Sequence, residues 1–156
     1  KDGVRLFAEP VKELAVLRGA EIASLMGTPL TDGENILAGK SAELIYFAGE
    51  IAVGEAKQIE LVLRGAKIVY DTKTQTIACG RHVAKLPITD GKLKLRALVD
   101  RGSVEFFGDD GRVAISTAHR AKADDKAISL IAKGGTAKVT WLDVYELKST
   151  WPRGEK

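Results

Sequence analysis

The chain has 156 residues, of which 45% are hydrophobic and 29% are charged, together with 16 glycines. This balance predicts one folded domain and excludes a disordered or collagen-like chain. The formal net charge is only +3, and basic and acidic residues alternate along the chain instead of forming blocks, so no nucleic-acid partner is expected.

One short helix is predicted near the N-terminus. Apolar residues recur at helical spacing over residues 11–18, where Pro10 suits the start of a helix and Gly19 suits a left-handed residue after its end. Because the chain begins at Lys1 and not at a methionine, we expect residues 1–20 to form this helix and a linker from a preceding domain.

The rest of the chain shows the period of strands. Apolar residues recur at every second position between turn signals, most clearly over residues 92–99. The expected strands cover residues 41–53, 57–64, 67–70, 75–79, 92–99, 103–107, 113–117, 127–132 and 138–147. Short strands joined by tight turns pair mostly antiparallel.

The predicted architecture is therefore an all-β, antiparallel β-sandwich of the jelly-roll or concanavalin-like type. It should span residues 21–150 and be followed by a tail over residues 151–156, with a small barrel as the alternative. The last strand is apolar on both sides, with Val139 and Trp141 on one and Leu142 and Val144 on the other. This pattern suggests a strand covered on both faces, in part by a partner domain.

Residues 98–111, LVDRGSVEFFGDDG, carry the most specific motif. They resemble the hairpin of the C-terminal sandwich of glycoside hydrolase family 32, where L-x-V-D-R-x-S-V-E-x-F precedes an N-D-G or D-G turn. The strictly matching residues are Asp100, Arg101, Ser103, Glu105 and Phe107. Residues 10–18 resemble the family's passage into the sandwich, and residues 145–152 resemble the L-K-S-[IT]-W that closes many members. The three matches occur in the family's order and span nearly the whole chain.

The resemblance implies a domain without catalysis of its own. In the family a five-bladed propeller carries the catalytic carboxylates in W-M-N-D-P-N-like, R-D-P and E-C motifs, and none of these strings occurs here. The implied function is a sandwich that packs on the propeller of a fructan- or sucrose-hydrolysing parent enzyme and stabilises it, with no cofactor. The alternative is a fructan-binding module, because the modules of family 66 are similar. The parent is expected to be secreted, periplasmic or at the cell surface.

Two interpretations are possible for the hairpin cluster, which consists of Asp100, Arg101, Ser103 and Glu105. The cluster could bind fructan or fructose, since charged groups make strong hydrogen bonds to hydroxyls. In the structural interpretation, Asp100 and Ser103 bind turn amides while Arg101 and Glu105 pair on the surface. We favour the structural interpretation.

The remaining candidates have ordinary structural explanations. Cys79, the single cysteine, cannot form an intramolecular disulfide and is expected to be a buried apolar residue, whereas His82 is expected at the surface. Asp109-Asp110 and Asp71 to Thr74 are predicted turns. No metal site is expected, and no apolar stretch approaches the length of a membrane-spanning helix.

An apolar face should mark the contact with the partner domain. Its candidate residues are Leu6, Phe7, Leu14, Leu17, Trp141 and Trp151. In the isolated chain such a face is expected to promote homo-oligomers.

Overall fold

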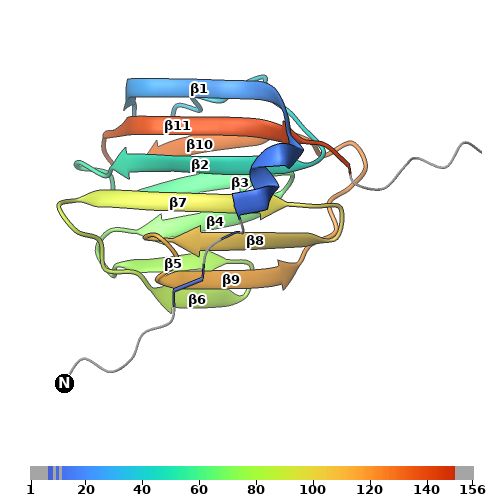
Figure 1. Ribbon diagram of the computed structural model, residues 1–156. Coiled ribbons are helices and arrows are strands. Elements are labelled where there is room, and N and C mark those ends of the chain that lie inside the picture. Colours follow the sequence, from blue (N-terminus) through green and yellow to red (C-terminus); the bar gives the residue numbers. More distant parts are fainter. Residues whose placement is uncertain (1–6, 9, 11, 150–156) are drawn as a thin grey trace, which may run out of the picture.

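In the computed structural model, which describes residues 7–8, 10 and 12–149, two antiparallel sheets stack face to face (Figure 1). The six-stranded sheet has the order β1-β11-β2-β7-β8-β9, and the five-stranded sheet has the order β10-β3-β4-β5-β6. The elements are η1 (Lys12–Leu17), β1 (Arg18–Leu30), β2 (Ile45–Ala52), β3 (Gln58–Leu63), β4 (Ala66–Asp71), β5 (Thr76–Cys79), β6 (His82–Lys85), β7 (Lys92–Val99), β8 (Ser103–Gly108), β9 (Val113–Ala118), β10 (Ile128–Lys133) and β11 (Ala137–Leu147). The prediction of an all-β antiparallel sandwich is confirmed.

The core lies between the two sheets. Alternating residues of each strand point inward, as the pattern of β7 shows, where Leu93, Leu95, Ala97 and Val99 are buried and their neighbours are not. The buried Tyr70 hydroxyl donates a hydrogen bond of 3.1 Å to the Leu86 carbonyl oxygen, so this polar group is satisfied inside the core.

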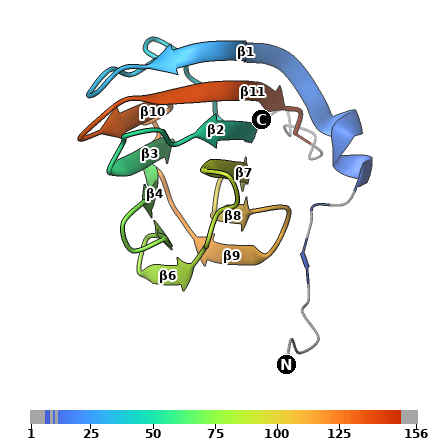
Figure 2. The ribbon, with the colours of Figure 1, turned by 90° about the vertical axis from the view of Figure 1, so that its left-hand side faces the viewer.

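The predicted helix is present as a 3₁₀ helix, η1. It lies on the outer side of the six-stranded sheet, away from the five-stranded one (Figure 2). The segment before it crosses the same side, where the Ala8 amide donates to the Gly111 carbonyl oxygen at 3.0 Å.

The predicted role of Gly19 is wrong. Its φ is not positive, and it lies inside β1, a strand absent from our prediction that begins at Arg18. The chain continues directly from η1 into β1, which pairs with β11 from Arg18↔Leu147 onward. An extended backbone is therefore needed where a left-handed one was expected.

The last strand, β11, contains a β-bulge, which changes our interpretation of its apolar pattern. Thr140 is the extra residue, because Val139 pairs with Ile51 while Trp141 pairs with Glu50. The bulge shifts the alternation by one residue, so Val139, Leu142 and Val144 all face the core. The bulge therefore explains why Val139 is buried on the same side as Leu142 and Val144, while Trp141 stays half-buried on the outer face.

Glu60 lies on the outer face of the five-stranded sheet between two lysines. Its Oε2 atom is 2.6 Å from Lys67 Nζ and 2.7 Å from Lys133 Nζ, and its side chain is only 10% exposed. Burial raises the pKa of Glu60, but the hydrogen bonds from Lys133 and Lys67 outweigh burial and hold the pKa below its ordinary 4.5. This ion cluster ties β3 to both of its neighbours, β4 and β10.

Replacing Glu60 with glutamine should lower the free energy of unfolding at neutral pH by about 1 kcal/mol. Because the folded pKa is lowered, the stabilisation is fully present above the ordinary value of 4.5 and is lost as the pH falls through the folded pKa. Urea denaturation at several pH values should show a difference from the wild type that shrinks below pH 4.5. The control, Asp110→Asn, removes the exposed partner of Lys94 and should cost less than about 0.5 kcal/mol. A difference independent of pH would contradict the assigned ion cluster.

Candidate functional site

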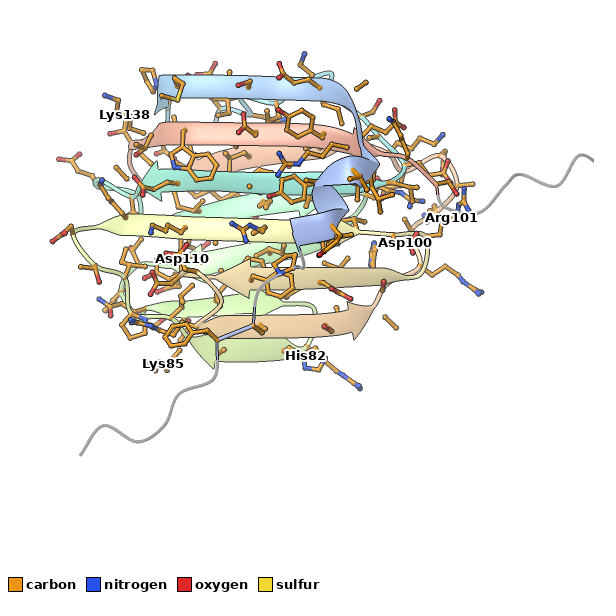
Figure 3. The ribbon with its side chains drawn as sticks, viewed as in Figure 1. His82, Lys85, Asp100, Arg101, Asp110 and Lys138 are labelled. Atoms are coloured by element: carbon orange, nitrogen blue, oxygen red, sulfur yellow. The ribbon has the colours of Figure 1, made fainter. Side chains whose placement is uncertain are left out.

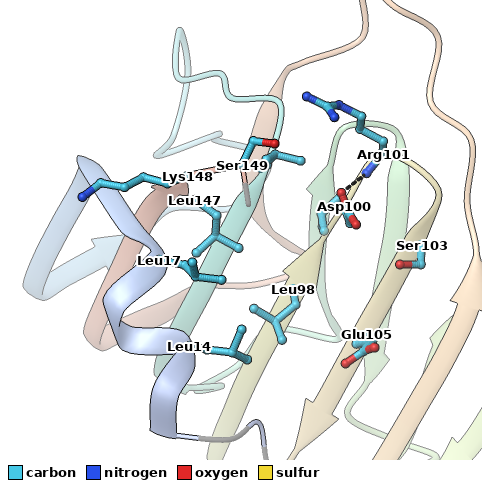
Figure 4. A pocket seen from close by; sticks show the side chains of 12 residues that line it. Leu14, Leu17, Leu98, Asp100, Arg101, Ser103, Glu105, Leu147, Lys148 and Ser149 are labelled. Atoms are coloured by element: carbon cyan, nitrogen blue, oxygen red, sulfur yellow. Dashed lines mark hydrogen bonds between the residues drawn. The ribbon is translucent and has the colours of Figure 1, made fainter. Parts of the chain in front are cut away.

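A pocket of about 390 Å³ opens between η1 and the hairpin that joins β7 to β8 (Figure 4). Six of the residues singled out in the sequence line it together: Leu14, Leu17, Asp100, Arg101, Ser103 and Glu105. We call this hollow the helix–hairpin pocket. The structure therefore joins the hairpin cluster and part of the predicted apolar face in one place.

The apolar side of the helix–hairpin pocket is made of leucines. Leu14 and Leu17 point from η1 toward Leu98 and Leu147, and Leu44 also contributes to the lining (Figure 4). All five are half-buried. Sequence reasoning missed Leu44, Leu98 and Leu147, although Leu98 gave a signal because it follows Lys92, Lys94 and Arg96 on the outer side of β7.

The polar side of the pocket is the turn between β7 and β8, at one end of the sandwich (Figure 3). The Arg101 amide donates to Asp100 Oδ1 at 2.6 Å, and the Asp100 amide donates to the Ser103 carbonyl oxygen at 2.9 Å. Asp100 thus accepts from a turn amide, as the structural interpretation expected for this residue.

Arg101 pairs with a different carboxylate from the expected one. Its Nε atom lies 2.9 Å from Glu43 Oε1, and among the described residues it makes no ion pair with Glu105. The hydrogen bond from Arg101 lowers the pKa of Glu43, and the same bond raises the pKa of Arg101. The expected pair failed because Glu43, from the segment before β2, approaches Arg101 from outside the hairpin.

Glu105 and Ser103 are unengaged polar groups on the hairpin side of the pocket. Neither the Glu105 carboxylate nor the Ser103 hydroxyl has a hydrogen-bond partner among residues 7–8, 10 and 12–149. Both face the pocket, so they can accept a hydrogen bond from a group placed inside it.

The arrangement is poorly suited to glycoside hydrolysis. A general acid must be kept protonated by a sheltered site, yet Asp100 and Glu105 are both exposed. No group of three or more His, Cys, Asp or Glu side chains that could hold a metal ion occurs in the described part of the chain. No helix among those same residues is long and apolar enough to cross a membrane.

Trp141 lies elsewhere than the pocket. It is half-buried on the outer face of the six-stranded sheet, where it lines a different hollow together with Phe107 and Arg96. On the same face the Arg18 guanidinium lies 4.4 Å from the centre of the Tyr46 ring and 5.1 Å from that of Tyr145. This face is therefore rich in aromatic side chains, whereas Leu6 and Trp151 fall outside the described residues.

The remaining sequence candidates are structural. Cys79 is 2% exposed, and burial raises the pKa of its thiol, which confirms the prediction of a buried apolar residue. His82 is half-buried in β6, a short strand absent from our prediction. Asp109 and Asp110, with φ of 49° and 53°, form the predicted turn between β8 and β9. Asp71 also serves a turn, since its Oδ1 accepts the Thr74 amide at 2.8 Å.

Comparison with known proteins identifies the family. The profile described as "Glycosyl hydrolases family 32 C terminal" matches residues 17–146. The levanase of Bacillus subtilis is 31% identical over 173 residues, which cover 96% of this chain and 26% of the levanase. A levanase of Bacillus sp. strain L7 is 30% identical over 99% of this chain and 19% of its own length. The chain thus spans about a quarter or less of these relatives.

Solved structures show the same fold. The exo-inulinase of Aspergillus awamori superposes with a TM-score of 0.82 at 22% identity, over 94% of this chain and 33% of the inulinase chain. Fructan 1-exohydrolase IIa of Cichorium intybus gives a TM-score of 0.70 at 14% identity, over 93% of this chain and 38% of that one. With the profile match over most of its length, the chain belongs to the family of C-terminal domains of glycoside hydrolase family 32.

Proposed function

We propose that this chain is the non-catalytic C-terminal sandwich of a fructan- or sucrose-hydrolysing enzyme, and that it stabilises the catalytic propeller of the same parent. The observation that carries the proposal is the match to levanases over nearly all of this chain but only about a quarter or less of theirs. The exposed carboxylates of the helix–hairpin pocket agree with a domain that performs no hydrolysis.

The outer face of the six-stranded sheet is the surface that we assign to the partner domain. Four large apolar side chains are strongly exposed in the described part of the chain, and three of them belong to η1, to β1 or to the segment before η1: Val16, Met26 and Phe7. Met26 pairs with Trp141, so both side chains lie on this outer face. Exposed apolar side chains on one face are groups that a protein–protein contact can remove from water.

A fructan-binding module is the weaker alternative. Sugar sites are hollows that combine polar groups with aromatic side chains, and the helix–hairpin pocket has polar groups but no aromatic residue among the described residues that line it. The aromatic residues Trp141, Tyr46 and Tyr145 lie on the sheet face outside this pocket.

Deletion of the sandwich from the parent enzyme separates the two functions. A stabilising domain should lower the thermal midpoint of the catalytic part when it is removed, because apolar surface of the propeller becomes exposed to water. Removal of a binding module should instead leave the midpoint unchanged and raise KM for the polymer while leaving KM for sucrose unchanged. The second pattern would refute our proposal.

The purified chain supplies the matching measurements. It should release no fructose from sucrose, inulin or levan, show no saturable heat on titration with fructan oligosaccharides, and associate with rising concentration in analytical ultracentrifugation. Fructose release in proportion to protein concentration, or saturable fructan binding by a strict monomer, would count against the accessory domain.

A further inference from the structure

Arg96 is a half-buried charge without a partner on the outer face of the six-stranded sheet. It lies on β7, and its Nε atom is buried without a hydrogen-bond acceptor. Within the described part of the chain, its guanidinium makes no hydrogen bond and no ion pair, even with Glu105, which also faces outward on the neighbouring strand β8. A buried donor that lacks an acceptor lowers the stability of a protein. An acceptor supplied by another domain would remove this cost.

Strand pairing places Arg96 in a row of side chains that crosses this outer face. Arg96 lies opposite Phe107 on β8 and opposite Ala48 on β2, and Ala48 lies opposite Asp143 on β11. Ala48 carries no acceptor in its side chain. Asp143 is two strands away, at a backbone separation of about 10 Å, and its Oδ1 atom already accepts a hydrogen bond of 2.9 Å from the Ser24 hydroxyl. The row therefore supplies no carboxylate to the guanidinium.

Two further carboxylates on this side of the sheet are engaged by lysines. Asp110 lines the same hollow as Arg96, but its Oδ2 atom lies 2.6 Å from Lys94 Nζ. Glu50, opposite Lys94 on β2, has its Oε1 atom 3.2 Å from Lys92 Nζ. These ion pairs satisfy the charges around Arg96 and leave the charge of Arg96 itself uncompensated.

We infer that the partner domain presents an aspartate or glutamate side chain to Arg96, so that a carboxylate–guanidinium pair forms where the two domains meet. This inference rests on the proposed function, which assigns the outer face to the propeller of the parent enzyme. Removing an arginine from water at a contact is costly unless an anion accompanies it, and a planar guanidinium binds a carboxylate through two parallel hydrogen bonds. Trp141 and Phe107 line the hollow beside Arg96, so their rings would shelter the pair from water.

Arg96→Gln should have different effects in the isolated chain and in the parent enzyme. In the isolated chain the thermal midpoint should move by no more than about 2 °C, because the side chain has no partner to lose. In the parent the midpoint should fall by several degrees, because the substitution leaves a carboxylate at the contact without its partner. Arg96→Lys should recover part of this loss, since an ammonium group keeps the charge but lacks the planar pair of donors. The matched control, Arg81→Gln, removes an exposed arginine from the turn between β5 and β6 and should give the same small shift in both proteins.

Trp141→Ala in the parent enzyme separates this inference from the proposed function. A lower midpoint for Trp141→Ala beside an unchanged midpoint for Arg96→Gln would show that the face meets the propeller without an acidic group at Arg96, and would overturn the inferred pair alone. Arg96→Lys no better than Arg96→Gln would also overturn it, because an anion should respond to the restored charge. Equal losses for Arg96→Gln in the isolated chain and in the parent would overturn it too, since the loss would then arise inside the sandwich. If deletion of the whole sandwich leaves the midpoint of the catalytic part unchanged, the proposed function fails and the inferred pair fails with it.

Discussion

Replacing Phe106 with alanine should lower the free energy of unfolding by about 3–5 kcal/mol. Phe106 is fully buried on the inner side of β8, where it pairs with Ala97 on β7 and Ile115 on β9, both also buried. Truncation of a phenylalanine there removes its transfer from water and leaves a cavity that the rigid sheets cannot close. The measurement is urea denaturation of both proteins, with an unchanged dependence on urea concentration confirming that the denatured states are comparable.

The neighbouring residue provides the control. Phe107 faces the outer side of the same strand and is half-buried, so Phe107→Ala should cost no more than about 1 kcal/mol in the isolated chain. Similar losses for the two variants would show that the outer face of β8 is packed as tightly as the core, contrary to the burial seen here. In the whole parent enzyme, the cost of Phe107→Ala should rise if this face meets the propeller.

The sequence predicted the hairpin around these phenylalanines correctly because local signals agree there. The alternation of β7 and β8 matches the side-chain period of strands, and the turn between them is built by the residues that suit a turn, Asp100 and Gly102. Where a strand has one continuously buried face, the pattern of apolar residues determines how it pairs with its neighbours and which side chains point to the core.

The strand β1 could not be predicted because two local features conceal it. Gly27, with φ of +60°, lies opposite the bulge at Thr140, and the facing of residues reverses there. Pro29 removes an amide that only an edge strand can spare, and β1 is an edge strand. In a sequence, a glycine and a proline this close together are typical of a loop. Only the pairing with β11 shows that they belong to a strand.

The candidate site was predicted in parts but not as a whole. The motif located Asp100, Arg101, Ser103 and Glu105, and helical spacing located Leu14 and Leu17, yet no local pattern indicates that these groups share a pocket. Their meeting depends on the order β11-β2-β7-β8, which brings Leu147 and Leu98 onto neighbouring parts of one sheet. Which residues share a pocket depends on how strands that are distant in sequence pair with one another. This pairing cannot be inferred from the local patterns of a single sequence.

The same dependence on long-range packing appears where the chain passes between the sheets. The connection from β2 to β3 and the connection from β10 to β11 both cross from one sheet to the other, and they lie side by side. The Thr136 carbonyl oxygen accepts the Glu55 amide at 3.0 Å and the Ala56 amide at 3.1 Å. In the sequence, the two glycines just before Thr136, Gly134 and Gly135, predict an ordinary turn. In the structure, the two glycines lie against different neighbours.

Gly135→Ala should therefore destabilise the chain by about 3 kcal/mol, against about 1 kcal/mol for Gly134→Ala. Gly135 has a φ of +148°, and a Cβ atom there would lie 2.6 Å from the Glu55 carbonyl carbon and closer still to its oxygen. That backbone is held by Thr136 and cannot retreat without opening the corner between the sheets. At Gly134, where φ is +72°, a Cβ atom would meet only the flexible Lys57 side chain. The loss of stability there should therefore be little more than the free energy needed to hold an alanine in the left-handed conformation. Thermal and urea denaturation of the two variants provide the comparison. Equal losses would mean that the contact with Glu55 relaxes easily, and that the backbone conformation alone determines the cost at both positions.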